Sequence, residues 1–503
     1  MKFEISYNVQ MRRITFILLF IAVPLSAQQN FDKLATDTLS AWKIPGLAVA
    51  VVQNDRVVYM NAFGVKEIGK SDPVTPDTLF EIASTTKAFT TTAVAMLADQ
   101  KKVDWDDSVH KYVEYFHLDD PCADSMVTLR DIASHRTGLS RHDELWDYTD
   151  WNREQVIRSV APLKLTKSFR STYQYQNIMF ALAGEVVAAA AKMPWDEFVR
   201  THIFDPLGMT HTRTSFADWN TTAHAVGHRY DSATQRVSLE PYIDYTRIAP
   251  AGQIKSCVRD MAQWLRFQLA GGTIDGKRLI SAEALEETHT PQTVIRIEGL
   301  GKEANPETNL EAYGLGWVVQ DYRGQTLVSH AGAINGFRTQ VALLPKQNAG
   351  MVIMENIGRG LSIVALRNEI LDRVLGGPTR DWNQLFLDIE RKSEAEGQTK
   401  KKEREAKRHL NTTPSRELQA YAGTYTDPAY GTATVTNDSS GLTLHYYRLN
   451  VPLTHFNYDT FSASIPEEDV DEQVQFALGP DGEVKAMTLF GEEFTKKTMN
   501  AER

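Results

Sequence analysis

The sequence predicts an α/β (α+β) fold in two parts. The larger part is an antiparallel sheet flanked by helices with a helical insert, and the smaller part is a C-terminal antiparallel β-barrel. The larger part is indicated by strand-like stretches near the start of the chain and again at residues 314–355, with helical stretches between them. The barrel is indicated by short segments after residue 416 that alternate apolar and polar residues. We therefore expect domains at residues 28–385 and 416–503.

The larger part is expected to begin with a helix at residues 31–43, which ends at Pro45 and Gly46. Two strands rich in β-branched residues follow, joined through Asn54-Asp55. Because strands recur at the far end of this part, one antiparallel sheet is expected to be built from both of its ends. The strands are expected at residues 47–53, 57–62, 314–320, 326–330, 336–344 and 350–355, and the later helices at 84–101, 178–192, 258–269 and 361–375.

Residues 386–415 separate the two domains. They are rich in Lys, Glu and Gln and contain few large apolar side chains, so a charged linker or an exposed helix is expected. Beyond them, Pro480-Asp481-Gly482 is typical of a hairpin turn between strands at 474–478 and 484–490. Six to eight such strands are expected in the C-terminal domain.

The overall charge excludes some functions. The 503-residue chain has a formal net charge of -10, whereas a nucleic-acid binder needs a basic face, so no nucleic-acid partner is expected. The sequence contains no HExxH zinc motif, no phosphate-binding P-loop and no GxSxG elbow, and we expect neither a metal nor a cofactor. The two cysteines are Cys122 and Cys257, and the sequence leaves open whether they pair.

The N-terminus predicts export. Arg12 and Arg13 precede an apolar run at residues 14–25, and small residues follow it up to Ala27. This order is typical of a secretory signal peptide, expected at residues 1–27. The run is shorter than the roughly 20 residues of a spanning helix, and no second apolar segment approaches that length. We therefore expect a periplasmic or secreted protein with no stable membrane span in the mature chain.

Ser84 and Lys87 are candidates for a nucleophile and its base. They lie three residues apart at the predicted start of the helix at 84–101, where free N–H groups and the helix dipole favour an alkoxide. A lysine withdrawn from water also loses its proton more easily. The alternative is that Ser84 only caps the helix while Lys87 lies in solvent. The similar pair Ser40 and Lys43 lies at the end of its helix, where backbone carbonyls oppose negative charge.

Two further motifs carry candidate catalytic groups. Tyr175 and Asn177 point to one side of an extended segment, where a tyrosine can relay a proton and an asparagine can hold a lysine and a substrate carbonyl. The alternative is a buried tyrosine and an asparagine that caps the next helix. His330 ends a predicted strand, and Gly332 would let the backbone approach a ligand closely. A histidine at a strand end without function is the alternative here.

Together and in this order, the three motifs resemble those of the serine β-lactamase-like hydrolases, which include class C β-lactamases, DD-peptidases, esterases and D-aminopeptidases. The resemblance covers about residues 30–385. Ser84-Thr85-Thr86-Lys87 is similar to the family's nucleophile motif and Tyr175-Gln176-Asn177 to its Tyr-x-Asn motif, while His330-Ala331-Gly332 stands at its Lys-Thr-Gly position. The flanking segments that also resemble the family are LFEIAS, TLRDIASHRTGLS, DPLGMTHT, APAGQIKS and YGLGW.

The resemblance implies a mechanism. Ser84 would attack a carbonyl carbon and form an acyl-enzyme, with Lys87 and Tyr175 sharing the proton transfers and either of them acting as the base. Asn177 would orient Lys87 and the acyl amide. The oxyanion hole would be formed by the N–H groups of Ser84 and Ala333.

One departure from the family affects the expected substrate. β-Lactamases and DD-peptidases have a lysine where this chain has His330, and an ordinary histidine is largely neutral at pH 7. This favours esters or the N-terminal side of small peptides, and replacing His330 by Lys is expected to raise β-lactam acylation. The alternatives are a penicillin-binding or peptide-sensing module that acylates or binds without turnover, or a weak β-lactamase.

The C-terminal domain resembles the lipocalin-like β domain attached to some peptidases of this family. The resemblance implies that it covers the mouth of the active site or mediates self-association, so a homo-oligomer is possible. A passive role is the alternative.

Overall fold

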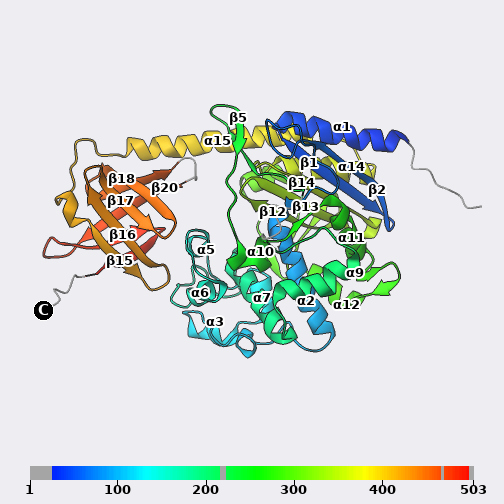
Figure 1. Ribbon diagram of the computed structural model, residues 1–503, viewed down its shortest axis with the longest axis horizontal. Coiled ribbons are helices and arrows are strands. Elements are labelled where there is room, and N and C mark those ends of the chain that lie inside the picture. Colours follow the sequence, from blue (N-terminus) through cyan, green and yellow to red (C-terminus); the bar gives the residue numbers. More distant parts are fainter. Residues whose placement is uncertain (1–24, 216–222, 466–469, 498–503) are drawn as a thin grey trace, which may run out of the picture.

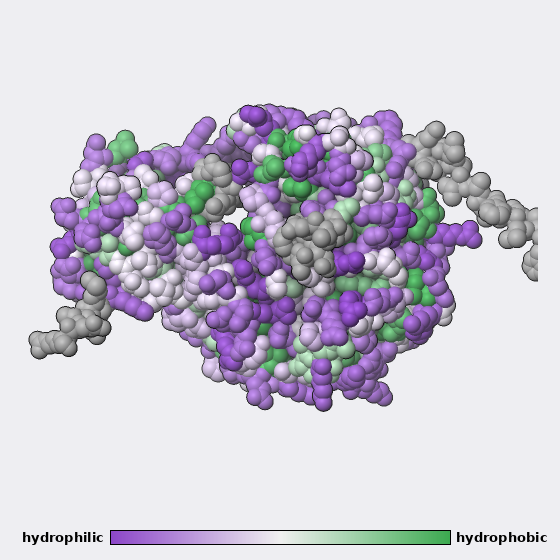
Figure 2. Space-filling model, in the orientation of Figure 1, coloured by the Kyte–Doolittle hydropathy of each residue, from purple (hydrophilic) through white to green (hydrophobic). Residues whose placement is uncertain are grey.

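The computed structural model describes residues 25–215, 223–465 and 470–497 (Figure 1). A large unit of sheet and helices lies beside a smaller β-barrel, and the long helix α15 (Trp382–Ala406) runs from one to the other. The surface in the same view is largely hydrophilic, with scattered hydrophobic residues (Figure 2). Most of the expected signal peptide, residues 1–24, lies outside the described residues.

The described part of the large unit is built on an antiparallel sheet of eight strands, in the order β2-β1-β14-β13-β12-β11-β10-β9. Next to the edge strand β2, β1 (Gly46–Gln53) pairs with β14 (Ala349–Glu355), about 300 residues later in the chain. The prediction of one sheet built from both ends of this unit is therefore confirmed. The other strands are β2 (Arg56–Gly64), β9 (Thr293–Ile295), β10 (Glu311–Tyr313), β11 (Val318–Tyr322), β12 (Gln325–Ile334) and β13 (Phe337–Leu344).

Both faces of this sheet are covered by helices, so its central strands are apolar on both sides. In β1, Leu47, Val49 and Val51 face a core shared with α1 (Leu25–Trp42) and α14 (Ser362–Leu375). The residues between them face the larger core of the helical insert. The helices of that second face include α2 (Thr86–Asp99), α7 (Asn177–Ala191) and α11 (Val258–Leu269).

Helix α2 lies at the centre of the helical layer (Figure 1). The sequence indicated one buried face, but every residue from Thr86 to Leu97 is buried, because α7, α10 (Ala249–Gly252) and α12 (Ala282–His289) all pack on it. The other short elements of this unit are α3 (Pro121–Met126), α4 (Leu129–Ala133), α5 (Glu144–Asp147), α6 (Arg153–Arg158), α8 (Trp195–Val199), α9 (Asp205–Leu207), α13 (Leu300–Ala304), β3 (Phe80–Glu81), β4 (His228–Asp231), β5 (Arg236–Leu239), β6 (Lys255–Ser256), β7 (Thr273–Ile274) and β8 (Lys277–Arg278).

The C-terminal strands form a closed barrel, as the alternating pattern predicted. Each strand pairs with the next, and the last pairs with the first. Aromatic side chains, among them Tyr421, Tyr425 and Phe476, fill the interior. The described strands are β15 (Gly423–Asp427), β16 (Gly431–Asp438), β17 (Gly441–Tyr446), β18 (Leu449–Asn457), β19 (Thr460–Ile465), β20 (Val470–Leu478), β21 (Val484–Leu489) and β22 (Glu492–Lys496).

The charged segment between the domains is a helix rather than a loose linker. Helix α15 begins at Trp382, inside the region expected to belong to the first domain, and the Asp381 side chain caps it by accepting from the Gln384 N–H. Its first turns bury Trp382, Phe386 and Ile389 against the large unit. Only the later turns are exposed, which explains why the composition of residues 386–415 indicated a solvated segment.

One strand boundary was predicted wrongly. The sequence placed a strand at residues 314–320, but the chain turns at residues 314–317, and β11 begins only at Val318. Gly316 has a φ of +78°, and a Cβ added to it would lie 2.9 Å from the Lys87 carbonyl oxygen. The glycine-rich turn thus packs directly on α2, where an extended segment would not fit.

Both cysteines are free, with Cys122 exposed and Cys257 buried. Within the described residues, no single helix is long and apolar enough to cross a membrane. Helix α7 and the bent segment Trp195–Leu207, inclined to it by 76°, meet the criteria of length and composition only as a pair.

Candidate active site

Ser84 lies in a tight 3₁₀ turn, Ala83–Thr85, which leads directly into α2. The preceding Ala83 has a φ of +46°, a left-handed conformation that non-glycine residues rarely adopt. Strand β12 packs against this turn so closely that a Cβ on Gly332 would lie 2.2 Å from the Ile82 carbonyl oxygen. The sequence predicted that Gly332 allows close approach to a ligand, but its close neighbour is the backbone that carries Ser84.

Lys87 is fully buried and contacts three oxygen atoms. Its Nζ lies 3.0 Å from Ser84 Oγ, 2.8 Å from Asn177 Oδ1 and 2.9 Å from the carbonyl oxygen of Ala251. Its side chain is therefore not in solvent, and Ser84 does not act as a side-chain cap for the helix. The structure contradicts the alternative of a capping serine with an exposed lysine.

Tyr175 approaches the same serine from the other motif, and its hydroxyl donates to Ser84 Oγ over 2.7 Å. Asn177 is the first residue of α7, one position earlier than predicted, and Gln176 caps this helix by accepting from the Ile178 N–H. Since Gln176 supplies the cap, the Asn177 side chain is free to accept from Lys87 and to donate to Asp143.

Burial sets the charge of these groups. It lowers the pKa of Lys87 well below its ordinary value, and the nearby positive charge of Arg141 lowers it further. Burial also raises the pKa of Tyr175 above its ordinary value, so the phenol keeps its proton. A neutral lysine can donate two N–H groups to Asn177 Oδ1 and the Ala251 carbonyl, which leaves its lone pair for the Ser84 proton. This geometry suits a base.

His330 lies inside β12 rather than at the end of a strand, and only 4% of it is exposed. Its Nδ1 lies 2.7 Å from the Ala331 carbonyl and its Nε2 2.9 Å from the Tyr313 hydroxyl. Nδ1–H therefore donates to the carbonyl, while Nε2 accepts from the tyrosine. Burial, with a smaller effect of Lys87, lowers the pKa of His330 to about 3, so the imidazole is neutral.

A pocket of about 150 Å³ opens at Ser84. Asn177 and Ala333 line it together with Ser84, whereas Lys87, Tyr175, His330 and Gly332 do not. The charged residues among its described lining are Asp143 and Asp147, both acidic. The remaining lining residues are Ala83, Trp146, Tyr245, Ile248, Ala251, Gly252, Ile334 and Asn335.

The sequence did not single out the wall of this pocket formed by residues 141–151. Asp143 Oδ1 accepts from Asn177 Nδ2 over 3.2 Å and from Trp146 Nε1 over 2.9 Å. Arg141 lies over the Tyr175 ring, with its guanidinium carbon 5.0 Å from the ring centre. The only indication of this wall in the sequence was the charged run at residues 141–144, directly after TLRDIASHRTGLS. Such runs are usually solvated, so this one did not point to a pocket.

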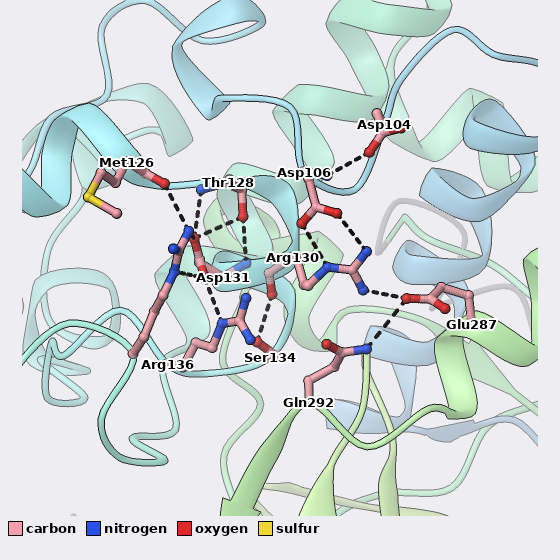
Figure 3. Close-up of polar contacts among 11 residues, drawn as sticks. Asp104, Asp106, Met126, Thr128, Arg130, Asp131, Ser134, Arg136, Glu287 and Gln292 are labelled. Carbon is pink, nitrogen blue, oxygen red and sulfur yellow. Dashed lines mark hydrogen bonds and ion pairs between the residues drawn. The ribbon is translucent and has the colours of Figure 1, made fainter.

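A buried carboxylate positions the segments around the site. Asp131 is fully buried on α4, where it forms a capping box with Thr128 and binds Arg136 (Figure 3). It also accepts two hydrogen bonds from Arg170. Because Arg170 lies shortly before Tyr175, this one carboxylate joins the segment before the pocket wall to the segment that carries Tyr175.

Outside the pocket lining, two clusters of three side chains could each hold a metal ion. Within each cluster the possible ligand atoms lie within 4.8 Å of one another. The clusters are Asp77, His211 and Cys257, and His110, His117 and Asp124. Neither includes a residue of the site at Ser84.

Comparison with known proteins places this site in a family. Residues 31–374, more than two thirds of the chain, match the family model described as Beta-lactamase. The chain belongs to the beta-lactamase family. Residues 407–503 of this family member match a separate domain of unknown function, DUF3471, which corresponds to the barrel.

Relatives of this family member include hydrolases. It is 28% identical to "Unguisins hydrolase ungD'" of Aspergillus campestris, with 90% of this chain and 88% of that protein covered. It is 25% identical to "Protein flp" of Staphylococcus aureus, over 66% of this chain and 63% of that protein. The octameric penicillin-binding protein homologue from Pyrococcus abyssi shares the fold, with a TM-score of 0.62, 19% identity, and coverage of 93% and 99%.

Proposed function

We propose that this family member is a serine hydrolase that cleaves small peptides or esters through an acyl-enzyme on Ser84. The observation that carries the proposal is the arrangement around Ser84 Oγ, which lies 3.0 Å from Lys87 Nζ and 2.7 Å from the Tyr175 hydroxyl. The serine can therefore lose its proton on one side while a phenol is hydrogen-bonded on the other.

In the proposed reaction, Ser84 Oγ attacks the substrate carbonyl carbon and its proton passes to Lys87 Nζ. The lowered pKa of the buried Lys87 and the raised pKa of the buried Tyr175 support this assignment of the base. The Tyr175 hydroxyl, which is hydrogen-bonded to Ser84 Oγ, then gives its proton to the leaving group, and Lys87 Nζ passes the serine proton to Tyr175. The N–H groups of Ser84 and Ala333 form the proposed oxyanion hole. Water then hydrolyses the ester of Ser84 and releases the acid.

The charges around the pocket favour one kind of substrate. Asp143 and Asp147 line it, each paired with an arginine that does not line it, Arg141 and Arg448, and His330 is neutral, so the described lining offers no cation to bind a substrate carboxylate. A free amine or an uncharged ester fits better. This supports action on esters or on the N-terminal side of small peptides, rather than on β-lactams or C-terminal carboxylates.

The second candidate function is a penicillin-binding or peptide-sensing module that acylates without turnover. The same arrangement of Ser84 and Lys87 would serve it, and the two functions differ in the rate at which water removes the acyl group. The similarity to a named hydrolase over most of both chains favours turnover.

Hydrolysis of p-nitrophenyl acetate by the wild type and by Ser84→Ala tests this proposal. Ser40→Ala is a matched control, because Ser40 also precedes a lysine by three residues but lies exposed on α1. The wild type and Ser40→Ala are expected to turn over, whereas Ser84→Ala is not. Equal turnover by all three proteins would refute the assignment of Ser84 as the nucleophile.

Export and self-association belong to the same proposal. Export rests on the predicted signal peptide at residues 1–27 and predicts that the mature chain begins after Ala27. Self-association is suggested by the name of the octameric homologue, and the mass of the protein in solution would test it.

A further inference from the structure

The C-terminal barrel contacts the wall of the substrate pocket directly. In an antiparallel barrel with consecutive strand pairing, alternate turns lie at the same end, so the turns β15–β16, β17–β18 and β21–β22 share one end. Figure 1 shows α5 and α6 on the side of the large unit that faces the barrel. All three turns place a side chain against the segment 142–151.

Arg448, in the turn β17–β18, makes the most polar contacts. Its Nη2 donates to Asp147 Oδ1 over 2.8 Å and its Nε donates to the Asp147 carbonyl oxygen. Its backbone N–H donates to the Tyr148 carbonyl, and its guanidinium lies over the Tyr148 ring. Asp147 is one of the two carboxylates that line the substrate pocket.

The other two turns contact the same segment. The Tyr430 hydroxyl lies 2.8 Å from His142 Nδ1, and His142 lies directly before Asp143. Phe490 stacks on Tyr148 with ring centres 5.8 Å apart and ring planes inclined by 10°. Aromatic stacking and hydrogen bonds from separate strands fix a loop more firmly than either does alone.

The opposite side of the segment faces the catalytic groups. Asp143 binds Asn177, which binds Lys87. A continuous series of contacts therefore runs from the barrel turns through residues 142–151 to the base of the proposed mechanism.

We infer that the barrel is a positioning element of the active site, in which Arg448 and Tyr430 hold the pocket wall around Asp143, Trp146 and Asp147 in the shape that selects the acyl group. This inference rests on the proposed function, because it concerns the substrate pocket of the same site. It assigns a role to the domain that matches only a family of unknown function.

The test compares two esters that share a leaving group, p-nitrophenyl acetate and p-nitrophenyl phenylacetate. The larger acyl group is expected to extend further toward the wall that includes Trp146, so the kcat/KM for the phenylacetate divided by that for the acetate reports the pocket shape. The ratio does not depend on the concentration of active enzyme, so partial unfolding alone does not change it. Arg448→Ala is expected to lower kcat/KM for the phenylacetate about tenfold relative to that for the acetate. A factor of this size corresponds to the loss of one charge-assisted hydrogen bond.

Two further variants complete the test. Tyr430→Phe removes only a hydroxyl and is expected to lower the ratio in the same direction by a smaller factor. Arg404→Ala removes the ion pair between α15 and Asp471, which holds the barrel elsewhere, and is expected to leave the ratio unchanged. Hydrogen exchange of residues 142–151 in the full chain is expected to rise in Arg448→Ala and not in Arg404→Ala.

An unchanged ratio in Arg448→Ala would overturn the inference, even if exchange in the segment rises, because the barrel would then hold the segment without shaping the pocket. Unchanged exchange would overturn it as well. Absence of an acyl adduct on Ser84 in the wild type would instead refute the proposed function, and exchange alone would then decide whether the barrel holds the segment.

Discussion

Burial of one lysine sets the proton chemistry of the site at the scale of single residues. Lys87 has no exposed surface, and its Nζ lies within hydrogen-bond distance of Ser84 Oγ, Asn177 Oδ1 and the Ala251 carbonyl oxygen. A lysine in solvent titrates near about 10.4 and would be protonated at neutral pH. The pH dependence of the reaction therefore reports whether Lys87 is the base.

The kcat/KM for p-nitrophenyl acetate is expected to rise with pH through the lowered pKa of Lys87 and then to level off. Below that pKa the lysine is protonated and cannot accept the Ser84 proton. Arg141→Ala removes a positive charge that lowers the pKa, so the rise is expected to move to higher pH. A rise that stays near the ordinary pKa of lysine, or that does not move in Arg141→Ala, would count against this assignment.

His330 is expected to contribute no ionisation between pH 5 and 8, because its pKa lies at about 3. His330→Gln keeps a polar group opposite the Tyr313 hydroxyl and is expected to leave the shape of the pH profile over this range unchanged, whatever its effect on the rate. If the wild-type profile changes with pH over this range and the profile of the variant does not, the imidazole ionises between pH 5 and 8, which would contradict the prediction.

The contact between Ser84 and Lys87 could be predicted from the sequence because motif spacing determines it. Ser84 and Lys87 meet because they lie one helical turn apart, and their environment then follows from a buried helix. Asp143 and the Ala251 carbonyl could not be predicted in the same way. Asp143 directly precedes α5 and Ala251 lies in the short helix α10, and tertiary packing positions both of these elements at the site. A backbone carbonyl also leaves no trace in the residue types.

At the scale of secondary structure elements, the contact between β12 and the turn at Ser84 fixes the nucleophile. Gly332 permits this contact, since any side chain there would collide with the Ile82 carbonyl. The strained φ of Ala83 lies in the same turn and persists because β12 packs against it.

Gly332→Ala is therefore expected to lower kcat/KM for p-nitrophenyl acetate about 100-fold, because a displacement of about 1 Å at a reacting group has an effect of that order. Gly360→Ala is the matched control, since the nearest atom to its added Cβ is Arg338 Nε at 3.7 Å. Circular dichroism would verify that both variants fold. A fully active Gly332→Ala would show that the close contact between β12 and the turn at Ser84 is not needed to position Ser84.

Asp131 supports the site through two elements. Asp131→Asn is expected to reduce the free energy of unfolding by about 3 kcal/mol, as for a broken buried ion pair, because Arg136 and Arg170 lose their counter-charge. Asp106→Asn breaks a more exposed pair with Arg130 and is expected to cost less than about 1 kcal/mol. Urea denaturation followed by tryptophan fluorescence measures both, and equal effects would contradict the proposed importance of Asp131.

The pH dependence of this contribution has a definite sign. Burial raises the pKa of Asp131, but hydrogen bonds from Arg170, the Thr128 backbone and Arg136 outweigh it, so the pKa lies below its ordinary value. The stabilisation is therefore complete above the pKa of an unfolded aspartate, near about 3.9, and disappears as the pH falls through the lower folded value.

The elements of the sheet were largely predictable, and their ends were not. The strand pattern located β1, β13 and β14, which are almost entirely buried. It ended the strand of β12 at His330, whereas β12 continues to Ile334. The strand expected at residues 314–320 begins only at Val318, because a glycine-rich turn before it packs on α2, which no local pattern reveals. The start of α15 was placed too late because the charged residues after Ile389 dominate the composition.

At the scale of the whole molecule, two units cooperate around one pocket. In the proposed mechanism the large unit supplies the nucleophile, its base and the oxyanion donors, and the barrel contacts the pocket wall at Asp147. The sequence predicted both units because each has its own periodicity. It did not predict their interface, since Tyr430, Arg448 and Phe490 occupy hairpin turns whose partners lie about 300 residues earlier.

Intact-protein mass spectrometry tests the central claim most directly. The wild type and Ser84→Ala are mixed with p-nitrophenyl acetate or with benzylpenicillin, quenched with acid, weighed and mapped by peptide digestion. We expect the wild type to carry a transient acetyl group on Ser84, with little penicillin adduct, and Ser84→Ala to carry neither. An acyl group on another residue, or the same mass in both proteins, would contradict the account.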